Sequence, residues 1–253
     1  MAFQSGITTS PNDLLDKIRL FATTYCGYTQ LMYQADSGYY RLHLQHAASG
    51  QYVNLHSWSS YIAAYGSTAF SSGLAYGSQT VSGGSISANL LSGSAEYFLF
   101  GGDGYCYCVT QYTSTIYNML LFGTMTKTCS FTGGAFLSDS YSGAVRADID
   151  SATNAWKTAN GSGNTSSRMF YTSLTRQLDS YSPITFNGVT PLYPITVEVG
   201  RTTPTYYYSM VGYIPEARLL RMNGQYANKD IVTLGSDEWM VFSTSYGGYA
   251  FKK

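Results

Sequence analysis

The clearest pattern of apolar and polar positions lies in the middle of the chain. Two apolar runs, residues 96–101 and 105–112, flank a glycine-rich turn at residues 101–104 whose residues tolerate positive φ. This arrangement predicts a β-hairpin. A third run, residues 117–122, is apolar at nearly every position, which predicts a strand with both faces covered at the centre of a sheet. We expect the three runs to form an antiparallel meander.

One amphipathic helix is predicted near the N-terminus. Ser10 is a good N-cap, Pro11 suits the first helical position, and Asp13 lies near the positive end of the helix dipole. Apolar residues then recur at helical spacing: Leu14, Leu15, Ile18 and Phe21. We therefore expect a helix over residues 11–24, ended by Gly27 in a left-handed C-cap.

The rest of the chain is typical of short strands joined by polar turns. Residues 29–33 and 39–44 flank turn chemistry at 35–38 and predict a hairpin with one solvated face. Further strands are expected at residues 52–58, 195–199 (with the length of an edge strand), 206–214, 231–234, 239–244 and 249–251. Exposed Gly/Ser-rich loops are expected at 66–88 and 157–168, and a short helix from Asp150 or Ser151 to Trp156.

Together these elements define a mainly β fold. We expect antiparallel sheets, packed in the manner of a sandwich, with one N-terminal α-helix. At 253 residues the chain can bury a sizeable core without disulfides or metals. No charged or proline-rich linker divides it, so we expect a single domain over residues 1–253, with two lobes meeting near residue 140.

Composition narrows the classes of partner. The formal net charge is zero and 11% of residues are charged, which argues against nucleic acid and anionic membranes as partners. The chain contains 25 Tyr and 26 Gly. Tyrosine among small residues is typical of protein contact surfaces, and it is equally typical of strands whose rings pack while their hydroxyls stay wet. The composition leaves both interpretations open.

The four cysteines suggest reduced thiols. The first six residues lack the basic and apolar regions of a signal peptide, which predicts a soluble protein made in the cytosol. Cys26, Cys106, Cys108 and Cys129 are too few and too scattered for a disulfide framework, and their spacing differs from that of a structural zinc site. An alternative is a disulfide between subunits, formed by any of these thiols after release into an oxidising medium.

No pattern of catalytic residues is present, so we expect neither enzymatic activity nor a cofactor. His43 and His56 are placed to lie on neighbouring strands, where two imidazoles could hold a metal or act on a water, and His46 lies between them. No cysteine or carboxylate close in sequence completes such a site. We therefore expect solvated strand histidines. The run at residues 147–154 starts like a calcium loop but has Ala152 where an oxygen ligand is needed.

Three stretches carry a resemblance to a known family. They are SGITTSPNDLLDKIRLFAT with the following Gly27, the central FGTMTKTCSFTGG, and Gly212-Tyr213-Ile214-Pro215 leading to DIVTLGSDEWMVFSTSY. Together they resemble a loosely defined family of virion structural proteins of tailed bacteriophages. Tyr28 stands where that family usually has tryptophan, and residues 135–205 show no match. The resemblance covers about a third of the chain and includes no catalytic residue.

The resemblance implies a non-enzymatic structural component of a virion, assembled in the host cytoplasm. Such a subunit would contact copies of itself in a symmetric ring or collar, and other virion proteins, on the neck, tail or baseplate. The alternative is a receptor- or glycan-binding module at the tail or fibre. In that case exposed Trp58, Trp156 or Trp239 would stack on sugar rings.

Overall fold

A computed structural model shows the fold of the chain. It describes residues 1–80, 86–89, 93–139, 145–150, 155–159, 169–172, 191–201, 207–220, 226–244 and 247–253. The described residues form three sheets and one helix, and every strand pair is antiparallel. The predicted fold class, mainly β with one N-terminal helix, is confirmed.

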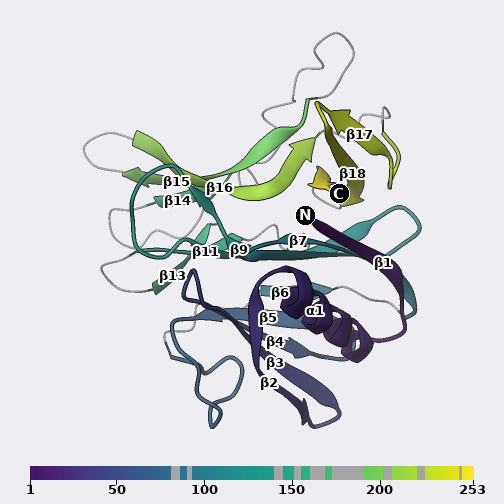
Figure 1. Ribbon diagram of the computed structural model, residues 1–253, viewed down its shortest axis with the longest axis vertical. Helices are drawn as coiled ribbons and strands as arrows, with labels where there is room; N and C mark the ends of the chain where they lie inside the picture. The colour runs from purple at the N-terminus through teal and green to yellow at the C-terminus, as the bar shows by residue number, and fades with distance from the viewer. Residues whose placement is uncertain are drawn as a thin grey trace.

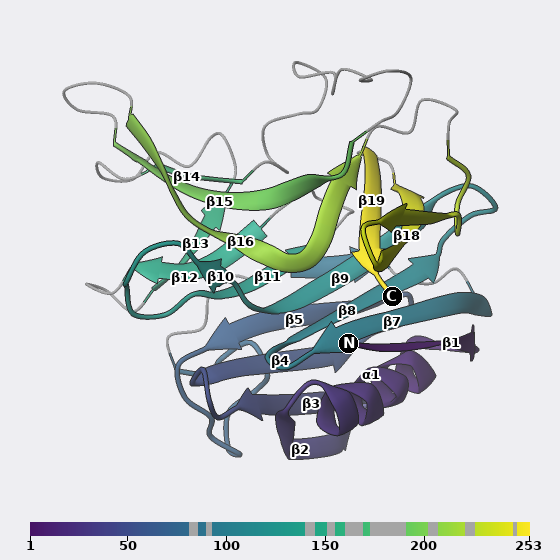
Figure 2. The ribbon, with the colours of Figure 1, turned by 45° about the horizontal axis from the view of Figure 1, so that its top comes forward.

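The three sheets are stacked in layers, as Figures 1 and 2 show. The central sheet has the order β1 (Ala2–Thr8), β7 (Ala95–Gly102), β8 (Tyr105–Gln111), β9 (Tyr117–Thr124), β11 (Ala135–Asp139), β12 (Val145–Asp150) and β13 (Ala155–Ala159). The N-terminal sheet has the order β2 (Tyr28–Asp36), β3 (Tyr39–His46), β4 (Gln51–Ser57), β5 (Tyr61–Ser67) and β6 (Ile86–Asn89). The C-terminal sheet has the order β14 (Met169–Thr172), β15 (Tyr193–Arg201), β16 (Tyr207–Leu220), β19 (Gly247–Lys252), β18 (Asp237–Thr244) and β17 (Ile231–Leu234), and β10 (Thr126–Lys127) pairs with β16.

The helix α1 (Pro11–Tyr25) forms where the sequence predicts it. The Ser10 hydroxyl accepts a hydrogen bond from the Asp13 backbone N–H at 3.1 Å, which caps the first turn. Gly27 has φ of 70° just beyond the C-terminal end. Its conformation suits glycine, and an added Cβ would lie 2.5 Å from Asp103 Oδ1 in the β7–β8 turn. The end of the helix is thereby fixed against the central sheet.

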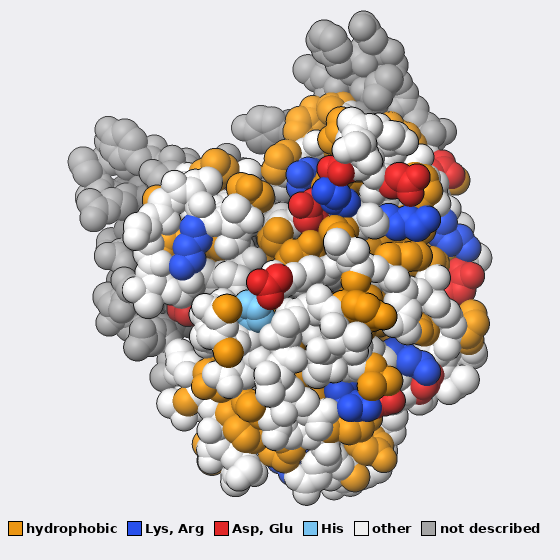
Figure 3. Space-filling view, viewed as in Figure 1, with side chains coloured by type: hydrophobic (Ala, Val, Ile, Leu, Met, Phe, Trp, Pro, Cys, Tyr) orange, Lys and Arg blue, Asp and Glu red, His pale blue; other side chains and the backbone are white. Residues whose placement is uncertain are grey.

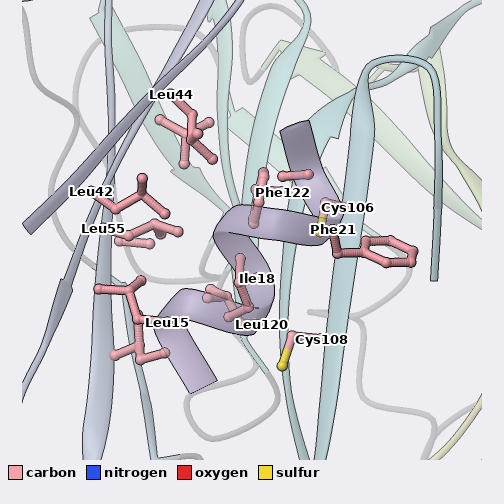
Figure 4. Close-up of a cluster of buried hydrophobic side chains, with 14 of the residues drawn as sticks. Leu15, Ile18, Phe21, Leu42, Leu44, Leu55, Cys106, Cys108, Leu120 and Phe122 are labelled. Carbon is pink, nitrogen blue, oxygen red and sulfur yellow. The ribbon is translucent and has the colours of Figure 1, made fainter. Parts of the chain in front are cut away.

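The lower core lies between the central and N-terminal sheets and is mainly aliphatic. Figure 4 shows Leu15, Ile18 and Phe21 of α1 entering this layer between side chains of the two sheets. The N-terminal sheet contributes Leu42, Leu44, Val53, Leu55, Ile62 and Ala64, and the central sheet contributes Leu99, Cys106, Cys108, Leu120, Phe122 and Leu137. Removal of this apolar surface from water is the main stabilising contribution of the layer.

The upper core lies between the central and C-terminal sheets and is rich in aromatic rings. The ring of Phe242 lies 5.1 Å from those of Phe98 and Tyr117, between centroids, and Phe100 stacks on Phe251 at 5.3 Å. These distances are typical of favourable aromatic pairs. The central strand β9 sends Leu120 and Phe122 to the lower core and Met119 and Leu121 to the upper core. The predicted central position and double coverage of this strand are confirmed.

The predicted hairpins are also present. The turn between β2 and β3 consists of Ser37 and Gly38, both with positive φ, and the turn between β7 and β8 has Gly104 with φ of 81°. A strand pair with a two-residue connection needs such conformations. The meander of β7, β8 and β9 pairs in the predicted order.

Two predictions of local structure are wrong. Asp150 ends strand β12 and Trp156 lies in strand β13, where a short helix was expected, because pairing between these strands overrides the local capping signal. Residues 195–199 belong to β15, which lies between β14 and β16 and is not an edge strand. Residue 140 falls between β11 and β12, which pair with each other within the central sheet. Of the loop predicted at residues 157–168, residues 157–159 lie in β13, and residues 160–168 lie outside the described residues.

Candidate functional site

The outer face of the N-terminal sheet carries a group of polar side chains, of which His43, Asn54 and His56 are buried. Arg41 pairs with His56 and His43 pairs with Asn54 across β3 and β4, while Tyr65 of β5 pairs with Asn54. Paired residues share one face of a sheet, so these five side chains form a continuous surface, which we call the outer face. The intervening leucines and valine point the other way, into the lower core.

A compact loop over residues 68–80, here called the cover loop, lies on this face. Its ends meet where the Thr68 backbone N–H donates to the Thr80 carbonyl at 3.2 Å. The buried Gln79 amide closes it from inside: its oxygen accepts from the Ser71 N–H at 2.7 Å, and its nitrogen donates to the carbonyls of Ser71 and Leu74 at 3.0 Å. This geometry is that of an Ω-loop.

Two aromatic residues of the cover loop pack on the two histidines. The ring centroid of Phe70 lies 4.9 Å from that of His43, and Tyr76 stacks on His56 at 4.5 Å with an angle of 22° between the planes. The ring centroid of Trp58 also lies 4.5 Å from that of His56. His43 is 0% and His56 is 2% exposed as a result. The prediction of solvated histidines is therefore wrong.

The protonation of His43 follows from its hydrogen bonds. Asn54 Nδ2 lies 3.3 Å from the Tyr65 carbonyl, which can only accept, so the Asn54 oxygen must face His43. His43 Nδ1 is 2.7 Å from that oxygen and must carry the proton. The series continues as Asn54 donates to Ser67 Oγ at 2.9 Å and Ser67 donates to the Ala69 carbonyl of the cover loop at 2.9 Å.

The other nitrogen of His43, Nε2, is buried and has no hydrogen-bond partner. Protonation there would place a charged N–H donor in a dry environment beside the Phe70 ring. Burial accordingly lowers the pKa of His43, with the nearby Arg41 charge acting in the same direction and the Asn54 hydrogen bond opposing it. His43 is a neutral imidazole at pH 7.

His56 lies in a related environment with one charged partner. Its Nε2 is 3.3 Å from Asp36 Oδ2, the same oxygen that lies 3.3 Å from Arg41 Nε. Its Nδ1 is buried without a hydrogen-bond partner. Burial lowers the pKa of His56 more than the Asp36 hydrogen bond and charge raise it. Both histidines of the outer face are thus held in the neutral form.

The described residues around the two histidines do not form a metal site. Within the described residues, no group of three or more His, Cys, Asp or Glu side chains is placed to hold a metal ion. The strand placement predicted for His43 and His56 is confirmed, but the pair has no third ligand there. His46 lies apart from them at the junction of the sheets, where Nε2 contacts Asp103 Oδ1 at 3.0 Å and Nδ1 contacts Ser49 Oγ at 2.8 Å.

The cysteines lie in two environments. Cys26, Cys106 and Cys108 are 0% exposed in the lower core, and burial raises the pKa of the Cys106 and Cys108 thiols well above the ordinary value. Cys129 is exposed, and all four are free thiols. A disulfide between subunits stays a prediction, and Cys129 is the cysteine that a second chain can reach without opening the core.

The tryptophans differ in their accessibility. Trp58 is partly exposed beside the cover loop and stacks with Tyr61 at 6.0 Å. Trp239 is 1% exposed, with the Arg218 guanidinium 4.5 Å from its ring, so it cannot stack on a sugar without rearrangement. The side chain of Trp156 lies outside the described residues. Of the two tryptophans whose side chains are described, Trp58 is the more accessible to a ligand.

Two strands at sheet edges form a separate surface feature. β1 borders the central sheet and β17 borders the C-terminal sheet, and both lie on the same side of the molecule in Figure 1. Neither contains a charged residue or proline. Three of their apolar side chains are exposed: Ile7 by 59%, Ile231 by 41% and Leu234 by 53%. Within the described residues no further strand pairs with either edge, so each can serve as a template for strand pairing.

The outer face could not be found from sequence patterns alone. The alternation of Arg41 and His43 with leucines is that of a half-solvated strand, and the cover loop has only weak periodicity. A usable signal is the content of the loop, since Phe70 and Tyr76 are large rings in a glycine- and serine-rich segment. Such rings need a surface on which to pack.

Comparison with known proteins provides no further assignment. No protein-family model matches the chain, and no curated protein matches its sequence.

Among the described residues, no helix is long and apolar enough to cross a membrane. On the face in Figure 3, acidic and basic side chains are few and intermixed, without a broad patch of one sign.

Proposed function

We propose that this chain is a non-enzymatic structural subunit of a tailed-phage virion, which assembles with copies of itself through its sheet edges. The observation that carries the proposal is the pair of open, uncharged edge strands β1 and β17. An edge strand presents unpaired backbone N–H and C=O groups, and proteins that remain monomeric usually protect such edges with lysine, proline or a bulge. β1 has seven residues in unbroken register with β7 and has none of these devices.

The resemblance implies a ring or collar, and strand pairing between unlike edges of successive copies could build one. Strand pairing between two different edges is a head-to-tail contact, and repeated rotation of such a contact closes a ring. The low charge of the chain and its high tyrosine content suit a surface packed against several neighbours. The resemblance of residues 5–27, 122–134 and 212–246 to virion proteins supports a place on the neck, tail or baseplate.

Lysine substitutions in the two edge strands test the proposal. We expect the wild-type chain to form a defined oligomer in size-exclusion chromatography with light scattering, and Ile7→Lys and Leu234→Lys to shift it toward monomer. Leu20→Lys is the matched control, because Leu20 is 47% exposed on α1 and lies on no sheet edge. The control should keep the wild-type oligomer. A monomeric wild-type chain that is also missing from purified particles would exclude the proposal.

A second candidate function is a receptor- or glycan-binding module at the tail or fibre. The partly exposed Trp58, with Tyr61 stacked beside it, supports this candidate, because sugar rings bind to aromatic faces. A glycan array with the wild-type chain and Trp58→Ala tests it. Binding that is lost in the variant, with the fold retained, would favour this function over the structural one.

A further inference from the structure

We propose that the cover loop is an acid-released lid, closed over the outer face while His43 and His56 are neutral and freed when they take up protons. The inference is independent of the assembly proposed above, since it concerns a different surface. It rests on the geometry of the contacts between residues 68–80 and the two strands β3 and β4.

The first step is the directed series of hydrogen bonds that ties the lid to the sheet. His43 Nδ1 donates to Asn54, Asn54 donates to Ser67, and Ser67 donates to the Ala69 carbonyl in the lid. Each donor and acceptor in this series is already used. An incoming proton can therefore bind only at His43 Nε2, which is buried and has no acceptor near it.

The second step is that the lid itself creates this burial. Phe70 packs on the His43 ring, and Tyr76 stacks on the His56 ring, which also contacts Trp58. Each histidine is therefore covered on one side by a ring of the lid. When the lid opens, both imidazoles reach water and recover their ordinary affinity for protons. Protons thus bind the open state more tightly and shift the population toward it.

The charged and titratable groups around His43 and His56 do not cancel the tighter proton binding of the open state. Among the described residues these groups are Asp36 of β2, Tyr39 and Arg41 of β3, Tyr65 of β5 and Tyr76 of the lid. The described part of β6 carries no titratable side chain.

Burial raises the pKa of Tyr76 above its ordinary value of 10.0. Arg41 disfavours a charge on either histidine, while Asp36 favours one on His56 but is outweighed by burial. The same Asp36 oxygen is shared with Arg41, which limits its effect on His56.

The pH dependence of the closed lid follows from the lowered pKa of His43 and His56. Both histidines have a pKa below the ordinary 6.5 in the closed state, so the closed lid is most stable above pH 6.5. As the pH falls below 6.5 the open state binds more protons, and the closed state loses stability until the pKa values of the closed state are passed. Each histidine can change the opening equilibrium by at most about tenfold per pH unit.

Hydrogen exchange measured by mass spectrometry tests the inference on the full chain. We expect peptides that cover residues 68–80 to lose protection between pH 7.5 and pH 5.5, by about tenfold or more after correction for intrinsic exchange rates. Peptides from β8 and β9 should stay protected at both values, which separates opening of the lid from global unfolding. Unchanged protection of the lid at pH 5.5 would overturn the inference.

Four variants assign the pH response to the two histidines. His43→Phe and His56→Phe keep a ring under the lid and remove one titrating group each, so each should reduce the pH response, and the double variant should abolish it. His46→Gln is the control, because His46 contacts Asp103 at the sheet junction and not the lid. A full pH response in both single variants, or its loss in His46→Gln, would also overturn the inference.

Discussion

The inner and outer faces of the N-terminal sheet are both buried, but different chemistry buries them. On the inner face Leu42, Leu44 and Leu55 are 0% exposed against α1 and the central sheet. On the outer face His43 and His56 are almost equally buried, under a loop and a network of hydrogen bonds. The leucines of the inner face do not titrate, and burial raises the pKa of the Cys106 and Cys108 thiols opposite them, so the first kind of burial does not weaken in acid. The second depends on the histidines staying neutral.

The comparison shows that the buried fraction of a face does not by itself determine how much that burial stabilises the fold. The inner face gains stability from each apolar group removed from water. The outer face keeps that gain only while its polar atoms are paired or uncharged. A loop that covers such a face therefore packs stably only while the polar atoms beneath it are paired or uncharged. A helix that covers leucines does not depend on protonation in this way.

The largest effect should come from a cavity on the inner face. Leu55→Ala removes a fully buried side chain of the lower core, and we expect a loss of about 2–5 kcal/mol in the free energy of unfolding. Urea unfolding at pH 7.5 and 5.5 measures it, and the loss should be equal at the two pH values. A loss below about 1 kcal/mol would show that this face is not close-packed.

A smaller effect is expected from the hydrogen-bond network of the outer face. Asn54→Ala leaves the His43 Nδ1–H donor without an acceptor in a buried place, and we expect a loss of about 1–3 kcal/mol. The matched change is Gln45→Ala, which removes a part-buried hydrogen bond to the Tyr52 hydroxyl on the same face. We expect that variant to lose about 1 kcal/mol or less. Equal losses in both would remove the special role given to Asn54.

The smallest effect is the difference in pH dependence between the wild type and His43→Phe. The histidine binds protons more tightly in the unfolded chain, so the wild type should lose stability below pH 6.5. The phenylalanine variant should lose less, by up to about 1.4 kcal/mol per pH unit. Urea unfolding from pH 7.5 to 5.0 gives both curves. Parallel curves would mean that His43 titrates alike in the two states.

Sequence patterns predicted the apolar parts of this fold well. The helix at residues 11–24 follows from its cap and its spacing, and the central place of β9 follows from its unbroken apolar run, because both signals are local. The patterns failed where strand pairing overrides the local signal. Asp150 and Trp156 lie in the paired strands β12 and β13 and not in a helix, and β15 lies between β14 and β16 and not at an edge.

The candidate site was predicted only in part. The neighbouring placement of His43 and His56 followed from the alternation of β3 and β4, but their burial depends on how residues 68–80 fold back over them. That contact is set by packing of Phe70 and Tyr76 and has no periodic signal. Sequence patterns likewise could not predict that β1 and β17 lie at sheet edges, because strand order is a property of the whole chain.

The most direct test of this account is the state of the His43 ring. Long-range nitrogen–proton NMR correlations of the imidazoles, followed from pH 8 to pH 5, report which ring nitrogen carries the proton and at what pH the second proton binds. We expect His43 to be neutral at pH 7.5, protonated at Nδ1, with a pKa below 6.5. A proton on Nε2 at pH 7.5, or a pKa at or above 6.5, would contradict the account.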